Sequence, residues 1–72
     1  MEFDYSKLKG RITEMYDSQT GFAKVMQVSD NHLSSCLCNK TRFSTKAMDR
    51  MIELLCIPEE EIGEYFFKLK VR

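Results

Sequence analysis

The chain has 72 residues, and its 11 lysines and arginines are balanced by 11 aspartates and glutamates, so its formal net charge is zero. Apolar residues make up 43% and charged residues 31%, which are the proportions of a globular domain and not of a disordered chain. This size excludes a nucleotide-binding unit with a separate substrate domain, and no apolar run approaches the roughly 18 residues of a membrane span. The first residues lack the apolar stretch of a signal peptide, so we expect one cytoplasmic domain over residues 1–72.

Apolar residues spaced three and four apart predict helices along most of the chain. The first helix is expected to begin at Asp4 or Ser6, either of which can cap it, and to end before Asp17. Ser18 is expected to cap a second, short helix that runs to about Met26. The apolar stripe of the first helix consists of Tyr5, Leu8, Ile12, Met15 and Tyr16.

A three-residue turn separates the second predicted helix from a third one, which Ser29 caps and which is expected to stop near Asn39. Asparagine is the residue other than glycine that best tolerates the left-handed conformation at a helix C-terminus. Ser44 is expected to cap a fourth helix, with Phe43 and Met48 at the spacing of a hydrophobic staple. The apolar stripe of this fourth helix consists of Met48, Met51, Ile52 and Leu55.

A fifth helix is predicted to have Pro58 at its first position, followed by three glutamates that suit the helix dipole, and to end near Phe66. The tail over residues 67–72 alternates apolar and basic residues, as a strand does, and would pair with residues 2–4 or with a second chain. The expected fold is therefore all-α and consists of five short helices; a short terminal strand is a further element that the sequence allows.

The second and third helices together predict a helix-turn-helix. Two helices that cross steeply through a short turn need a small residue where they approach, and Ala23 supplies it. Met26, Val28 and Leu33 supply apolar contacts before, in and after the turn. A generic pair of packed helices shares half of these features, but the spacing of Ala23, the turn and Leu33 favours the helix-turn-helix.

The stretch QTGFAKVMQVS over residues 19–29, followed by Leu33 and by residues 37–40, resembles the Cro/repressor-type helix-turn-helix of temperate phages. The segment over residues 57–67 resembles that of small phage regulators in Gram-positive bacteria. The length and the two ends are similar to those of the modulators of repression, anti-repressors that such phages use against their own repressor in the lysis–lysogeny decision. This resemblance implies an all-α regulator that acts in the cytoplasm of a bacterial host.

The chain departs from the family pattern at two positions. The family usually has glycine in the turn, where this chain has Gln27, and glycine after the third helix, where it has Asn39. Asparagine is tolerable in a left-handed conformation, whereas glutamine at a positive φ is more strained.

The resemblance implies that the third helix is a recognition helix. Family members that read DNA use its outward face for base edges and the end of the preceding helix for phosphates, and Gln19 matches a position that contacts the DNA backbone. The outward face comprises Ser29, Asp30, Asn31, His32, Ser34 and Ser35, and the remaining candidate contacts are Lys24, Cys38, Lys40 and Arg42.

The chemistry of this face bears on whether the partner is DNA or protein. Asn31 can pair with adenine, but Asp30 points a negative charge outward and no lysine or arginine lies within residues 29–39. DNA-binding domains usually carry a basic patch, because phosphate neutralisation supplies most of their affinity. An acidic and polar face instead suits the basic DNA-reading surface of a repressor. We therefore favour an anti-repressor that binds the phage repressor; the alternative is a Cro-like repressor that binds operator DNA, alone or in a ternary complex with the repressor.

Three cysteines, Cys36, Cys38 and Cys56, indicate reduced thiols and not a disulfide framework. Cys36 falls on a core position of the motif and is expected to be buried. His32 lies four residues before it, but no second pair of ligands accompanies them, so no zinc site is expected. No phosphate loop, metal-binding histidine pair or activated nucleophile is present, which predicts neither an enzyme nor a cofactor.

Two groups of large apolar residues remain to be placed. The methionines of the helices, Met15, Met26, Met48 and Met51, are expected to fill the core. The aromatic end of the chain either packs on the core or forms a surface for a partner or for a homodimer. This end consists of Tyr65, Phe66, Phe67 and Leu69.

Overall fold

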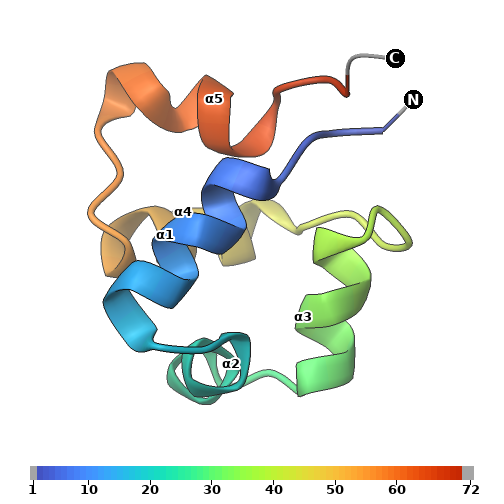
Figure 1. Ribbon diagram of the computed structural model, residues 1–72, viewed down its shortest axis with the longest axis vertical. Coiled ribbons are helices and arrows are strands. Elements are labelled where there is room, and N and C mark those ends of the chain that lie inside the picture. The colour runs from blue at the N-terminus through green and yellow to red at the C-terminus, as the bar shows by residue number, and fades with distance from the viewer. Residues whose placement is uncertain (1, 71–72) are drawn as a thin grey trace.

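The computed structural model describes residues 2–70, and within them it confirms the all-α prediction (Figure 1). Described residues form five α-helices, one short 3₁₀-helix and no sheet. The elements are α1 (Ser6–Tyr16), α2 (Gln19–Met26), α3 (Asp30–Leu37), α4 (Thr45–Leu54), η1 (Glu59–Glu61) and α5 (Ile62–Phe66).

Helix α2 has contacts with three other helices. It packs against α1, α3 and α4, while α1 also packs against α5. Figure 1 shows α1 in the middle of the molecule, with α5 on one side of it and α2 and α3 on the other. The core side chains with almost no exposed surface come from all five α-helices or their ends, and the largest are Phe22, Phe66, Leu8, Ile12, Leu33, Met51, Leu55 and Cys36.

Serine caps begin three of the helices, as predicted. The hydroxyl oxygens of Ser18, Ser29 and Ser44 each accept a hydrogen bond from the backbone N–H three residues later, at 3.0–3.1 Å. Each such cap is worth about 1 kcal/mol relative to alanine, because it satisfies a donor that the helix leaves unpaired. The caps therefore set where α2, α3 and α4 begin.

The start of α1 differs from the prediction by one residue. Tyr5 is the N-cap residue, and neither Asp4 nor Ser6 occupies that position. The Asp4 carboxylate nevertheless accepts a hydrogen bond from the backbone N–H of Ser6 at 2.9 Å. Hydrogen bonds from Ser6 lower the pKa of Asp4, because they stabilise its ionised form.

The predicted fifth helix divides into two parts. Pro58 is the N-cap of η1 and has extended backbone angles, so it is not the first helical residue. The N–H of Glu61 donates to the carbonyl of Pro58 at 2.9 Å, which closes the tight turn of a 3₁₀-helix before α5 begins. The predicted end near Phe66 is confirmed.

Met15 was predicted to lie in the core, and this prediction is wrong, because 40% of its surface is exposed. Tyr16 takes the inward position at this end of α1. Its hydroxyl donates to the carbonyl of Leu54 at 2.8 Å, and its ring centre lies 5.0 Å from that of Phe22. Met26 and Met51 are buried as expected, and Met48 packs partly buried against the core.

The two ends of the chain pair with each other, as the alternation in the tail suggested. Phe3 and Leu69 form an antiparallel bridge, with the N–H of Asp4 donating to the carbonyl of Lys68 at 2.6 Å. The N–H of Lys70 donates to the carbonyl of Glu2 at 3.0 Å. The pairing is a single bridge, and the last two residues of the predicted strand, 71 and 72, lie outside the described residues.

Lys7 joins α1 to the last helical segment. Its ammonium group pairs with Glu61 and Glu64, and it lies 4.8 Å from the ring centre of Tyr65. The hydrogen bond to Lys7 lowers the pKa of Glu64, and the same bond raises the pKa of Lys7. Both shifts favour the charged pair in the folded state.

This pair predicts a contribution to acid stability. The pKa of Glu64 is lower in the folded chain than its ordinary value of 4.5. Its contribution to the free energy of unfolding is therefore present above pH 4.5 and is lost as the pH falls through the folded pKa. We expect the melting temperature of Glu64→Gln to fall less between pH 5 and pH 3 than that of the unmodified chain. Thermal unfolding followed by circular dichroism measures this, with Glu60→Gln as the control; equal slopes for all three proteins would contradict it.

Alanine substitution at Gly10 in α1 and at Gly21 in α2 is expected to change the stability in opposite directions. A Cβ at Gly10 would meet nothing within 4 Å, whereas a Cβ at Gly21 would lie 2.9 Å from the carbonyl oxygen of Tyr16. We expect Gly10→Ala to stabilise the fold by about 1 kcal/mol, the usual difference in helix propensity. Gly21→Ala should destabilise it, because the backbone must shift. Urea denaturation measures both, and a stabilising Gly21→Ala would contradict the packing at this residue.

Candidate functional site

The outward residues of α3 fall into two groups by exposure. Asp30, Asn31 and His32, in its first turn, are exposed, while Ser34 and Ser35 are half-buried. The N-cap Ser29, also exposed, has its hydroxyl engaged by the N–H of His32. The side chains open to a partner are thus concentrated at the N-terminal end of α3, and we call Asp30, Asn31 and His32 the α3 face.

The remaining candidate residues are divided between the two ends of α3. Lys24 is exposed in the last turn of α2, before the turn that leads into α3. Cys38 and Lys40 are exposed beyond the C-terminal end of α3. Gln19, half-buried, is the first residue of α2. The candidates therefore do not form one cluster.

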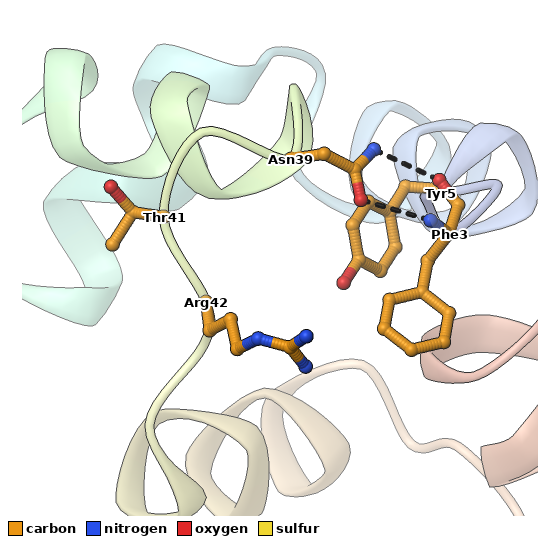
Figure 2. A pocket seen from close by; sticks show the side chains of 5 residues that line it. All are labelled: Phe3, Tyr5, Asn39, Thr41 and Arg42. Carbon is orange, nitrogen blue, oxygen red and sulfur yellow. Dashed lines mark hydrogen bonds between the residues drawn. The ribbon is translucent and has the colours of Figure 1, made fainter. Parts of the chain in front are cut away.

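Arg42 lies away from the α3 face. Its side chain points into a small pocket that it shares with Phe3, Tyr5, Asn39 and Thr41 (Figure 2). Burial of the phenol raises the pKa of Tyr5, and the nearby Arg42 charge only partly opposes this rise. Arg42 therefore lies in the region where the chain ends meet, beyond the C-terminal end of α3, and its role beside the α3 face stays a prediction.

Cys36 is buried, with 1% of its surface exposed, which confirms it as a core residue. Burial raises the pKa of its thiol, because the thiolate would lose its hydration. Its sulfur lies 3.9 Å from Nε2 of His32. Among residues 2–70 no group of three histidine, cysteine or acidic side chains is placed to hold a metal ion.

The turn between α2 and α3 contains the strained residue that the sequence predicted. Gln27 has φ 62° and ψ 39°, a left-handed conformation that glycine adopts more readily. The N–H of Val28 donates to the carbonyl of Ala23 at 3.0 Å, and the N–H of Gln27 donates to that of Lys24 at 3.1 Å. These two bonds form a Schellman motif, which terminates α2.

Asn39 terminates α3 in the same way. Its φ is 66°. The N–H of Asn39 donates to the carbonyl of Cys36 at 3.2 Å, and the N–H of Lys40 donates to the carbonyl of Ser35 at 2.9 Å. The expected left-handed asparagine after the third helix is therefore confirmed.

The side chain of Asn39 does something that a glycine cannot do. Its Oδ1 accepts a hydrogen bond from the N–H of Phe3 at 2.9 Å, and its Nδ2 donates to the carbonyl of Phe3 at 3.0 Å (Figure 2). The bridge to Leu69 uses the carbonyl of Glu2 and the N–H of Asp4. The N–H and carbonyl of Phe3, which lies between them, therefore point away from the tail. The amide of Asn39 therefore satisfies both groups and ties the end of α3 to the paired chain ends.

Two cations near the turn were missed by the sequence analysis. Lys46 and Arg50 are exposed on α4, and they line a groove of about 320 Å³ against the turn that contains Gln27. Residues 18–50 hold five cations against two anions, Asp30 and Asp49, a net charge of +3. The signal was present in the sequence, but only the packing of α4 beside α2 shows that these charges adjoin the turn.

These features define a small all-α domain with an exposed polar helix face beside a basic groove. The chain belongs to the family described as "Protein of unknown function (DUF739)", whose profile matches residues 1–69. A search of curated proteins finds no match for the chain. Among the helices in residues 2–70, none is long and apolar enough to cross a membrane.

A solved structure is similar to this chain over its whole length. It is the solution structure of the modulator of repression (MOR) of the temperate bacteriophage TP901-1 from Lactococcus lactis. The two sequences are 33% identical, the TM-score is 0.81, and the match covers 100% of this chain and 97% of the other. The resemblance to modulators of repression that the sequence predicted is thereby confirmed.

Gln27 and Asn39, the positive-φ residues before and after α3, give a matched pair of stability predictions. Gln27→Gly should stabilise the fold by about 1 kcal/mol, because it relieves a strained backbone and removes no side-chain hydrogen bond to any of residues 2–70. Asn39→Gly gives the same relief but removes two hydrogen bonds to Phe3, so we expect a net loss of about 1 kcal/mol. Urea unfolding of both variants measures the difference; equal effects would show that the amide contributes nothing.

Proposed function

We propose that the chain is an anti-repressor in the lysis–lysogeny switch of a temperate phage, where it binds the DNA-binding domain of the phage repressor. The observation that carries this proposal is the full-length similarity to a modulator of repression. In this proposal α2, the three-residue turn and α3 form a helix-turn-helix, with α3 in the position of the recognition helix. The protein then acts by binding and not by catalysis, in the cytoplasm of the bacterial host.

The α3 face has the chemistry that this role requires. Asp30 and Asn31 are exposed, and Asp30 takes part in none of the ion pairs within residues 2–70. The DNA-reading surface of a repressor is basic, since it must neutralise phosphates. A carboxylate and hydrogen-bonding groups on one helix are complementary to such a surface, and the complex would prevent the repressor from reaching its operator.

The alternative is a Cro-like repressor that binds operator DNA, alone or together with the phage repressor. The net charge of +3 over residues 18–50 favours it. Against it, Asp30 stands at the start of α3, where DNA-reading helices place the side chains that contact base edges. A carboxylate there would face the strongly negative duplex.

One set of measurements separates these functions. We expect calorimetry at micromolar concentration to show a complex between this chain and the repressor of the phage that carries it, without DNA. In a gel shift with operator DNA at about 50 mM salt, the repressor alone should bind the DNA and this chain alone should not. When this chain is added to the repressor, the DNA should run as free DNA again. A shift by this chain alone would support the Cro-like alternative, and a larger complex in the mixture would support co-repression.

A charge reversal on the α3 face tests the surface. We expect Asp30→Lys to weaken repressor binding about tenfold or more, because it places a cation against a basic surface. Glu60→Lys makes the same change in charge on η1, at an exposed position outside both the α3 face and the groove, and should leave the affinity unchanged. Equal effects of the two variants would contradict the assignment of the α3 face.

A further inference from the structure

The groove beside the α2–α3 turn has an apolar floor and a charged rim. We call it the α4 groove; it is lined by Met26, Gln27, Val28, Ser44, Lys46, Ala47 and Arg50. The end of α2 and the turn form one wall, and the first half of α4 forms the other. Because the floor is apolar and both charges at the rim are positive, the groove suits a ligand that carries a negative charge on a short apolar stem.

The two cations lie on the same side of α4, at the groove. Lys46 and Arg50 lie four residues apart on α4, so their side chains share one face of the helix. One terminal nitrogen of Arg50 donates to the carbonyl of Val25 at 3.4 Å, which holds the guanidinium at the α2 side of the groove. A guanidinium has five N–H donors, and the others are left for a second acceptor.

Neither cation has an acidic partner within the described residues. The ion pairs in residues 2–70 involve Lys7, Arg11 and Lys70, all outside the groove. Both side chains are exposed, so they are accessible to a partner. The groove therefore offers two positive charges that are in no ion pair among residues 2–70, and a hydrogen bond already holds one of them in place.

We infer that the α4 groove receives an aspartate or glutamate side chain of the protein that the α3 face binds. This inference rests on the proposed function and adds a second, oppositely charged contact to it. The methylene groups of the incoming residue would lie on Met26, Val28 and Ala47, and its carboxylate would accept hydrogen bonds from Arg50 and Lys46. The partner would thus present a basic surface to α3 and an acidic residue beside it.

The pairing of charges favours a protein carboxylate over a DNA phosphate. The α4 groove is positive, while the α3 face that begins directly after the turn carries Asp30. DNA offers phosphates to both places, so it would be attracted at one and repelled at the other. A protein can present opposite charges a few residues apart, and an acidic side chain also gains from the apolar floor.

Reversing the groove charges tests the inference. In calorimetry with the DNA-binding domain of the phage repressor, we expect Lys46→Glu together with Arg50→Glu to weaken binding about tenfold or more. Lys46→Gln together with Arg50→Gln should weaken it less, in the same direction. Lys9→Glu is the control on exposed α1 and should have no effect. Circular dichroism of each variant verifies that the helices are retained.

The outcomes separate this inference from the proposed function. If the unmodified chain does not bind the repressor domain, the proposed function fails, and the inference fails with it. If Asp30→Lys weakens binding but the groove variants bind like the unmodified chain, the inference alone is overturned. It is also overturned if the unmodified chain shifts operator DNA, the groove variants lose that shift, and their repressor binding is unchanged, because the groove would then hold a phosphate.

Discussion

The burial of α2 is the constraint on which the rest of the structure depends. A chain of 72 residues without a disulfide has little core to share, and α2 is the helix that packs on α1, α3 and α4 at once. Phe22 and Ala23 have almost no exposed surface. With its inner side committed to the core, the helix fixes where α3 begins, and so it orients the α3 face and the wall of the α4 groove.

The short connections between helices are possible because residues other than glycine adopt positive φ values. Each of Asp17, Gln27, Asn39 and Cys56 follows a helix and has a positive φ, while none of the glycines in residues 2–70 does. Backbone hydrogen bonds hold the chain in this conformation at the helix ends. After α4, for example, the N–H of Ile57 donates to the carbonyl of Ile52 at 3.1 Å. At Asn39 the side chain is used as well, so the residue that ends α3 also fixes the chain termini.

The zero net charge conceals an uneven distribution of charge along the chain, and two regions differ most. Residues 18–50 carry a net charge of +3, and residues 53–64 carry five glutamates and no cation. In the folded chain the first region surrounds α3 and the α4 groove, and the second forms the end of α4, η1 and α5. A protein of this kind can attract a partner by one surface without the overall basic charge of a nucleic-acid binder.

The sequence by itself determined the all-α class, the serine caps of three helices and the strained turn residue, because capping and helical periodicity act within a few residues. It also determined that Asp30, Asn31 and His32 lie on the exposed side of α3. Only the tertiary structure decided that Tyr16 and not Met15 turns inward, that Arg42 points to the chain ends, and that Asn39 binds Phe3. The α4 groove belongs to the same group, since its walls come from helices that meet only when α4 packs against α2. These features depend on contacts between residues distant in the chain, which no local pattern encodes.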